Sequence, residues 1–169
     1  IIKTIAVAAL AVFGAACSNE PALTLSGLDP QAFVGEKNGK ETSLYTLTNA
    51  NGMEVCITNF GGRLVSVMVP DKDGKMVDVI LGFDNINDYM TKSSDFGASI
   101  GRYANRIAGG KFQLDGETVV LDQNDGENCL HGGAEGWQYQ VYDAELVDPQ
   151  TLKLTMVDPD GHMGFPGTV

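Results

Sequence analysis

The most informative stretch of this 169-residue chain is Asn105-Arg106-Ile107, which is followed 25 positions after Arg106 by His131. Arg106 carries five hydrogen-bond donors in a planar fork, which suits bridging to hydroxyl groups or to a carboxylate. His131 directly precedes Gly132 and Gly133, so we expect it in a loop where its ring lies close to a ligand without backbone crowding. A solvated arginine and a surface or capping histidine fit the same spacing, and spacing alone favours that simpler alternative.

Other residue patterns that could do chemistry are weaker. Trp137 could stack on the apolar face of a sugar, although a lone tryptophan is more often a core residue. His162 lies in a glycine-rich turn and is interpreted as a loop residue. The G-x-S-x-G pattern around Ser99 lacks the strand and helix that a hydrolase nucleophile needs. No metal site is predicted, because the acidic turns at residues 71–74 and 158–161 lack EF-hand spacing and no cysteine pair lies near either histidine.

The composition describes the scaffold that must position these side chains. The length suits one domain, or part of a larger one. The net charge of −11 disfavours nucleic acid as a partner, because phosphate binding depends on Lys and Arg. The 21 glycines are well above average usage, which suggests a turn-rich β architecture, and their lack of a three-residue period excludes collagen. Cys56 and Cys129 lie in or beside apolar segments and are expected to be small buried thiols, with a disulfide between them left open.

Short strands separated by turn signals begin near residue 44. The pattern predicts strands at residues 54–58, 64–69, 77–81 and 152–156. The best hairpin signal is at residues 112–121, where Asp115 and Gly116 suit the positive φ angles of a type I′ turn. Residues 85–90 could form a single helical turn, and longer helical periodicity is absent after the N-terminal apolar run. The fold class is therefore all-β, a sandwich or barrel of antiparallel strands.

The N-terminal residues read as an export signal. Lys3 supplies a positive charge, and residues 5–13 form an apolar run too short to span a bilayer. The small residues before Cys17 resemble a bacterial lipobox, although Gly14 stands where leucine is usual. Residues 1–16 are therefore expected to be a signal peptide and Cys17 a lipidated residue, giving a periplasmic or outer-membrane-associated lipoprotein. An ordinary secretory signal is the alternative, and both readings mean export.

Two further segments complete the expected domain organisation. Residues 17–40 contain the anchor cysteine and a Ser-, Pro-, Gly-, Asn- and Lys-rich stretch that reads as a flexible tether. Residues 41–169 form the folded domain. The sequence stops at Val169 after a turn, at what looks like the first step of a strand, so we expect the chain to be truncated.

Four sequence blocks, taken in order, resemble the aldose 1-epimerase (galactose mutarotase) family, and the resemblance runs from about Leu44 to Val169. The blocks are Asn59-Phe60-Gly61-Gly62-Arg63-Leu64 with Val69-Pro70-Asp71-Lys72-Asp73-Gly74; Asp78-Val79-Ile80-Leu81-Gly82-Phe83-Asp84 with Tyr89; Gly101-Arg102-Tyr103-Ala104-Asn105-Arg106-Ile107-Ala108-Gly109-Gly110-Lys111-Phe112; and Asn128-Cys129-Leu130-His131-Gly132-Gly133 with Gly136-Trp137, Asp160-Gly161 and Gly164-Phe165-Pro166-Gly167. Any one block is weak, and the four together are a strong signal.

The resemblance implies a large antiparallel β-sandwich of the galactose mutarotase type, of which residues 41–169 are the N-terminal part. It also implies interconversion of the α and β anomers of free hexoses such as galactose and glucose, without metal or organic cofactor. In similar proteins the residues matching Asn105, Arg106 and His131 bind the sugar. The general acid, a second histidine, and the base, a glutamate, are expected beyond Val169, so no catalytic residue is assigned within this sequence.

The expected partners are an aldose sugar and, through Cys17, a membrane, and the expected oligomeric state is a monomer. One alternative function is a non-catalytic carbohydrate-binding lipoprotein on the same fold, which would lack the acid or the base. A second alternative is an epimerase of hexose 6-phosphates. That function calls for extra basic residues around the pocket, and the acidic chain makes it the weaker reading.

Overall fold

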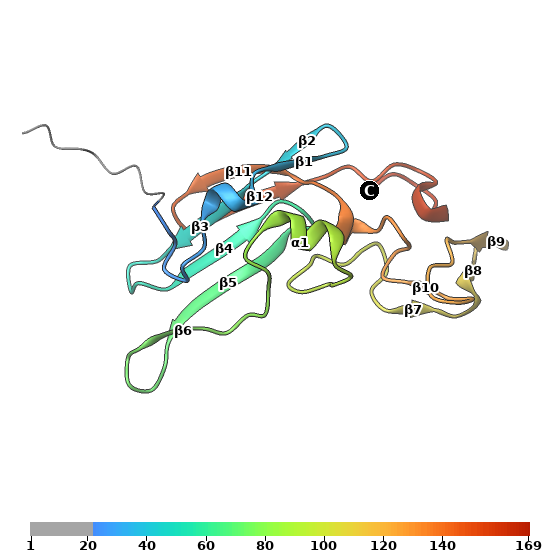
Figure 1. Ribbon diagram of the computed structural model, residues 1–169. Helices are drawn as coiled ribbons and strands as arrows, with labels where there is room; N and C mark the ends of the chain where they lie inside the picture. Colours follow the sequence, from blue (N-terminus) through green and yellow to red (C-terminus); the bar gives the residue numbers. More distant parts are fainter. Residues whose placement is uncertain (1–21) are drawn as a thin grey trace, which may run out of the picture.

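The computed structural model describes residues 22–169, and β-strands provide most of their regular structure (Figure 1). The expected signal peptide, residues 1–16, and Cys17 lie outside the described residues. Across residues 22–169, no helix has the length and apolar character needed to cross a membrane. The expected all-β class agrees with the structure, because within residues 22–169 the one α-helix, α1, spans only Ile86–Thr91.

A four-stranded antiparallel sheet with the order β3-β4-β5-β6 forms the centre of the larger part of the molecule. Its strands are β3 (Leu44–Thr48), β4 (Glu54–Thr58), β5 (Arg63–Pro70) and β6 (Met76–Asp78). The strands predicted at residues 54–58 and 64–69 are confirmed as β4 and β5. In β4 the buried and half-buried residues alternate, as expected where one face of a strand packs on a core.

The strand predicted at residues 77–81 is wrong in its second half, because β6 ends at Asp78. One carboxylate oxygen of Asp78 accepts hydrogen bonds from the backbone N–H groups of Val67 and Ile80, each at 3.0 Å. The side chain thus takes the place of a backbone acceptor and ends the ladder. Val79 and Leu81 remain largely exposed.

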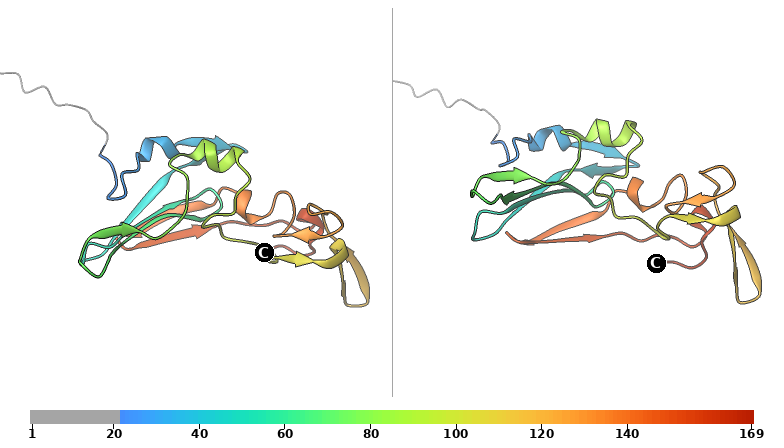
Figure 2. Two further views of the ribbon diagram at one scale, coloured as in Figure 1. Left: turned by 60° about the horizontal axis from the view of Figure 1, so that its bottom comes forward. Right: turned by 90° about the horizontal axis from the view of Figure 1, so that it is seen from below.

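A second antiparallel hairpin consists of β11 (Asp143–Asp148) and β12 (Thr151–Thr155). This hairpin lies next to the four-stranded sheet in both views of Figure 2. Leu152 and Leu154 are half-buried and the intervening Lys153 is exposed, which confirms the alternation predicted for residues 152–156. The chain segment before β11 is tied to the end of β4 through a bridge between Phe60 and Val141.

The N-terminal described segment lies with α1 over one side of the sheet (Figure 2). It contains a 3₁₀ turn, η1 (Pro30–Phe33), and the hairpin of β1 (Gly35–Lys37) and β2 (Lys40–Thr42). The tether expected over residues 17–40 is therefore wrong for this part. Phe33 is fully buried, and its carbonyl accepts a hydrogen bond from the buried Thr42 hydroxyl at 2.9 Å. A buried aromatic ring holds the segment against the core despite its linker-like composition.

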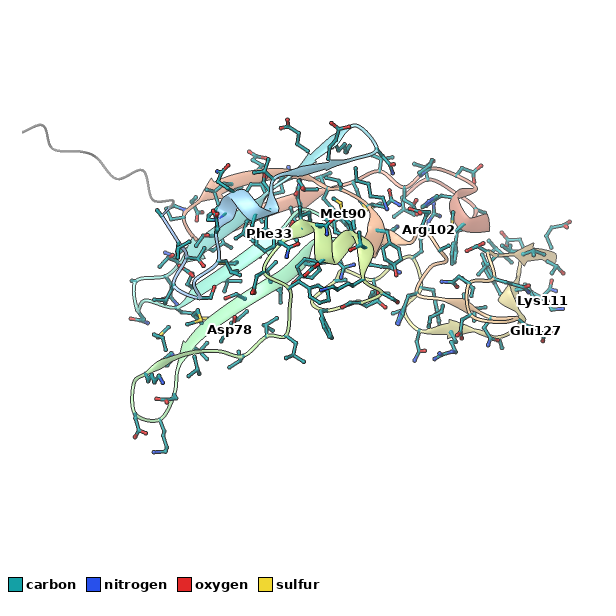
Figure 3. All side chains as sticks on the ribbon, viewed as in Figure 1. Phe33, Asp78, Met90, Arg102, Lys111 and Glu127 are labelled. Carbon is teal, nitrogen blue, oxygen red and sulfur yellow. The ribbon has the colours of Figure 1, made fainter. Side chains whose placement is uncertain are left out.

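Helix α1 confirms the single turn predicted at residues 85–90. Asn85 caps it, because its side-chain oxygen accepts the backbone N–H of Asp88 at 2.9 Å. Its residues Ile86 and Tyr89 are buried, and Met90 packs against the core cluster that includes Phe33 of η1; both Phe33 and Met90 are labelled in Figure 3. The larger core contains Leu28, Phe33, Cys56, Phe60, Val65, Ile86, Tyr89 and Val141.

A smaller lobe lies at the other end of the molecule (Figure 1). It contains the antiparallel pairs β7 (Arg106–Ile107) with β10 (Cys129–Leu130) and β8 (Lys111–Leu114) with β9 (Glu117–Val120). The predicted β8–β9 turn is confirmed by positive φ angles of 51° and 87° at its two central residues. The lobe has its own buried cluster, Leu121, Cys129 and Phe165. The remaining 3₁₀ turns are η2 (Ala108–Gly110), η3 (Trp137–Tyr139) and η4 (His162–Gly164).

Candidate functional site

Strands β7 and β10 bring together the three residues expected to bind a ligand. Arg106 pairs with Leu130 across this short ladder, which places Asn105 and His131 side by side just beyond its end. The backbone N–H of His131 donates to the carbonyl of Asn105 at 3.1 Å. We call Asn105, Arg106 and His131 the three-residue site.

The imidazole of His131 is oriented by the backbone of Asn105. The N–H of Asn105 donates to His131 Nδ1 at 3.0 Å. Because Nδ1 accepts this bond, the proton of the neutral ring lies on Nε2. Both residues have left-handed backbone conformations, with φ of 69° at Asn105 and 53° at His131. The site therefore holds an Nε2–H donor whose direction is set by two turns that face each other.

Arg106 is held by a carboxylate that the sequence analysis did not single out. Its Nε donates to Asp125 Oδ2 at 2.6 Å, and its Nη1 lies 3.5 Å from Asn105 Oδ1. About half of the Arg106 side chain is exposed. Asp125 thus fixes one edge of the guanidinium fork, while the other edge remains accessible for donation to ligand oxygens.

A pocket of about 390 Å³ lies beside Arg106. Tyr103, Ile107, Phe112 and Phe165 line the rest of it. A volume of this size lies within the range of small-molecule pockets, and a largely apolar lining with one charged donor is typical of them. The pocket can accommodate a ring with one apolar face and hydroxyl groups directed toward Arg106.

Proton transfer needs groups that the described residues do not bring to His131. Within residues 22–169, no carboxylate lies within 4.0 Å of the His131 ring nitrogens. The same residues contain no group of three or more His, Cys, Asp or Glu side chains that could hold a metal ion. Among the described residues, the three-residue site therefore offers hydrogen-bond donors and one side-chain amide, with no metal cluster beside them.

Two other patterns have structural roles. Ser99 is followed by no helix, and its hydroxyl donates to the carbonyl of Gly62 at 3.1 Å, so it does not form a nucleophile elbow. Asp71 accepts the backbone N–H groups of Asp73 at 2.8 Å and Lys75 at 2.9 Å. That pattern is an Asx turn, and it explains the acidic residues there without an ion.

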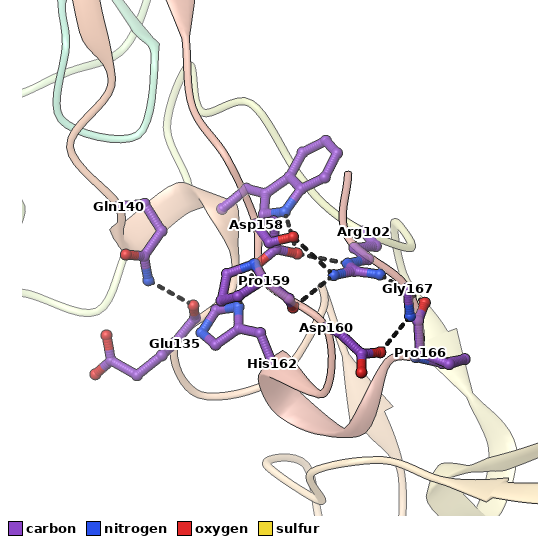
Figure 4. A network of polar contacts seen from close by, with 10 residues as sticks. Arg102, Glu135, Gln140, Asp158, Pro159, Asp160, His162, Pro166 and Gly167 are labelled. Carbon is purple, nitrogen blue, oxygen red and sulfur yellow. Dashed lines mark hydrogen bonds and ion pairs between the residues drawn. The ribbon is translucent and has the colours of Figure 1, made fainter.

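The second acidic turn, at residues 158–161, contains a buried carboxylate. Asp158 is buried, and its Oδ2 accepts hydrogen bonds from Arg102 Nε and, at 2.9 Å, from Trp137 Nε1 (Figure 4). His162 Nδ1 lies 2.5 Å from Asp158 Oδ1, so the expected loop residue lies against the buried carboxylate. We call Arg102, Trp137, Asp158 and His162 the Asp158 network. Burial favours a raised pKa for Asp158, but its hydrogen bonds from Arg102 and Trp137 and the nearby charges outweigh burial and lower that pKa.

Sequence reasoning missed this network because its members are far apart in the chain. From the sequence, Asp158 is one of several acidic turn residues, and Trp137 is either a platform for a sugar or a core residue. Its indole instead packs on Gly101, where an added Cβ would lie 2.0 Å from the ring. Asp-Pro-Asp-Gly reads as a turn whether or not its first carboxylate is buried, so no local signal could have revealed the network.

Arg63 is a second buried group that the pattern of residues did not reveal. Its guanidinium is fully buried and donates to the backbone carbonyls of Ser94, Phe96 and Gln138 at 3.0, 3.3 and 2.9 Å. It also lies over the Phe60 ring, 5.4 Å from the ring centroid. Burial lowers the pKa of Arg63. The cation thus joins the loops that contain Ser94 and Gln138 to strand β5. Among residues 22–169, no carboxylate lies within 4.0 Å of its nitrogens.

Cys56 and Cys129 are buried free thiols, as predicted. Burial raises the pKa of both thiols, which keeps them protonated near neutral pH. They have no part in the three-residue site. Cys129 instead packs within the small core of the lobe beneath β10.

Comparison with known proteins gives a consistent result. The aldose 1-epimerase of Escherichia coli (strain K12) is 37% identical over 132 residues, which are 78% of this chain and 38% of that protein. The galactose mutarotase of Bos taurus is 41% identical over 115 residues, which are 68% of this chain and 33% of that protein. The chain thus spans less than half the length of these relatives.

A solved structure and a family model agree with these relatives. The crystal structure of galactose 1-epimerase from Lactobacillus acidophilus NCFM matches with a TM-score of 0.70 at 32% identity, covering 79% of this chain and 40% of that one. This likeness confirms the expected fold class. A family model described as aldose 1-epimerase matches residues 43–169. With the β-rich fold and both comparisons pointing the same way, the chain belongs to the aldose 1-epimerase family.

Proposed function

We propose that the natural protein is an aldose 1-epimerase that interconverts the α and β anomers of free hexoses such as galactose and glucose. The observation that supports this most is the pairing of β7 with β10, which brings Asn105 and His131 next to Arg106, a residue that lines a pocket of about 390 Å³. Family membership and the names of the relatives point the same way.

The roles of the three residues follow from their donors. Arg106 donates from the free edge of its fork to sugar hydroxyl groups, while Asp125 holds the opposite edge. His131 donates its Nε2–H to the ring oxygen or a neighbouring hydroxyl, since its Nδ1 is occupied by the backbone of Asn105. Asn105 both orients the imidazole and presents its side-chain oxygen next to Arg106. The site fixes the pyranose ring before any proton moves.

The reaction itself needs one acid and one base. A base removes the proton from the C1 hydroxyl, an acid protonates the ring oxygen, and the bond between C1 and that oxygen breaks. The C1–C2 bond of the open aldehyde then rotates, and the ring closes on the opposite face while both protons return. We propose that the acid and base lie in segments of the natural protein other than residues 22–169, as the resemblance to the family implies.

The test is the decay of optical rotation of freshly dissolved α-D-galactose, measured with the complete natural protein. The wild type should accelerate the decay, and His131→Ala should lower kcat/KM by about 100-fold, as expected for losing one positioned donor. Lys153→Ala, at an exposed position on β12, is the matched control and should retain wild-type kinetics.

The outcomes separate the candidate functions. A wild-type protein that leaves the spontaneous decay unchanged would contradict the enzyme assignment, and calorimetric binding of galactose by that protein would favour the carbohydrate-binding alternative. A His131→Ala variant as fast as the wild type would contradict only the role of His131.

We further propose that residues 1–16 direct export and that Cys17 is lipidated, giving a monomeric lipoprotein in the periplasm or at the outer membrane. The apolar run and the small residues before Cys17 support this proposal. In bacteria grown with a clickable palmitate analogue, the wild type should be labelled and recovered with membranes, and Cys17→Ala should be neither. Equal labelling of the two proteins would contradict the anchor.

A further inference from the structure

We propose that Asp158 is a positioning residue for sugar binding, because one buried carboxylate fixes the spacing between the Asn105–Arg106 segment and the His131 segment. The proposal rests on the proposed function of the three-residue site. Asp158 does not touch the pocket beside Arg106, so its effect passes through Arg102 and Trp137.

The first link runs to the segment that carries Asn105. Arg102 precedes Asn105 by three positions and is almost fully buried. Its Nε donates to the Asp158 carboxylate, and its Nη groups donate to the carbonyls of Pro166 and Pro159, each at 2.9 Å. Figure 3 shows Arg102 at the junction between the sheet and the smaller lobe. The arginine therefore clamps the start of the site segment to the turn that contains Asp158.

The second link runs to the segment that carries His131. Trp137 Nε1 donates to the same oxygen of Asp158 that Arg102 contacts. The backbone N–H of Trp137 donates to the carbonyl of Gly101 at 3.2 Å, and the next side chain, Gln138, donates to the carbonyl of His131 at 3.0 Å. Both site segments are thus bonded to each other and to one carboxylate oxygen.

A third contact comes from the turn after Asp158. Met163 lies against Gly133, where an added Cβ would approach its side chain to 3.0 Å. The Met163 carbonyl accepts the backbone N–H of Asp122 at 3.0 Å, and an Asp122 carboxylate oxygen accepts the N–H of Ala134 at 2.8 Å. His162, close to Asp158 Oδ1, fixes the start of this turn. The Asp158 network therefore supports the His131 loop from two sides.

Removing the carboxylate should let the two segments separate. A displacement of about 1 Å within a binding site can cost a factor of about 100 in rate. Because the three-residue site is proposed to bind the sugar while the acid and base come from other segments, we expect this cost mainly in binding: Asp158→Ala should raise KM for galactose by about 10- to 100-fold, with a smaller change in kcat. A purely structural role would instead lower the amount of active protein and leave KM unchanged.

The experiment uses the complete natural protein and four variants. Asp158→Ala removes both links, Asp158→Asn keeps an oxygen that accepts from Arg102 or Trp137, and Trp137→Phe removes one donor while retaining the ring. Asp143→Ala is the control, because Asp143 makes an exposed ion pair with Lys40. KM and kcat are measured by polarimetry, and the His131 ring nitrogens are followed by ¹⁵N NMR.

The proposal predicts a graded result. KM should rise most for Asp158→Ala, less for Trp137→Phe and least for Asp158→Asn, with Asp143→Ala unchanged. The Nδ1 signal of His131 should shift in the same order as its hydrogen bond from Asn105 weakens. Unchanged KM together with an unchanged His131 signal in folded Asp158→Ala and Trp137→Phe would overturn the proposal. The NMR measurement needs no activity, so it judges Asp158 even if the wild type proves inactive and the proposed function fails.

Discussion

Gly132 allows the close approach of the two site segments, and replacing it tests whether that approach matters. Gly132 has φ of +85°, and an added Cβ would lie 1.8 Å from the carbonyl oxygen of Gly101. Contacts below 3.0 Å are not tolerated, so Gly132→Ala requires a shift of about 1.2 Å, the difference between those two distances. That shift separates the His131 loop from the segment that leads to Asn105.

Gly116 provides a matched control for the backbone strain. Its φ is +87°, nearly the same as at Gly132, but nothing lies within 4 Å of an added Cβ. Gly116→Ala should therefore cost about 1–2 kcal/mol of stability, the ordinary cost of a left-handed alanine. Gly132→Ala should cost about 2–5 kcal/mol, because overpacking adds a further 1–3 kcal/mol.

The assay measures both stability and activity. Urea unfolding gives the difference in free energy between the two variants, and polarimetry with α-D-galactose gives kcat/KM. Gly132→Ala should lose about 100-fold in kcat/KM under conditions where it is folded, while Gly116→Ala should remain within about twofold of the wild type. Equal kinetics for the two variants would refute the claim that the close approach of Gly132 to Gly101 sets the site geometry.

Two further predictions concern buried charges. Arg63→Met should lower the free energy of unfolding by about 3 kcal/mol, because three backbone carbonyls lose their donor; a variant as stable as the wild type in urea would contradict this. The pKa of Asp158 in the folded protein is lowered from 3.8, because its hydrogen bonds and nearby charges outweigh burial. The ionised carboxylate therefore stabilises the fold fully above pH 3.8. This stabilisation is lost as the pH falls through the lowered pKa of the folded protein. Acid titration should therefore destabilise the wild type more steeply than Asp158→Asn below about pH 4, and identical slopes would count against the assigned role.

Local patterns predicted the local elements well. Alternation of apolar and polar residues located β4 and β12, a mostly apolar run located β5, and the Asp115-Gly116 pair located the turn of the β8–β9 hairpin. These features depend on neighbours within a few positions, which a sequence displays directly. Asn105, Arg106 and His131 came from the resemblance; the structure places them together, while their role in binding stays a prediction.

The features that sequence reasoning missed all depend on long-range burial. Residues 22–40 have the composition of a linker, yet Phe33 inserts its ring into the core and orders the segment. Asp158 and Arg102 lie 56 positions apart, and Arg63 finds its carbonyl partners 31 to 75 positions away. Neither a polar residue's burial nor its distant partners follow from spacing, because tertiary packing decides both.

The structure of the complete natural protein with bound D-galactose tests the central claim most directly. The account predicts electron density for the sugar within hydrogen-bond distance of Arg106 Nη and His131 Nε2, with Asn105 still donating to His131 Nδ1. Galactose bound at another place, with neither side chain in contact, would contradict it.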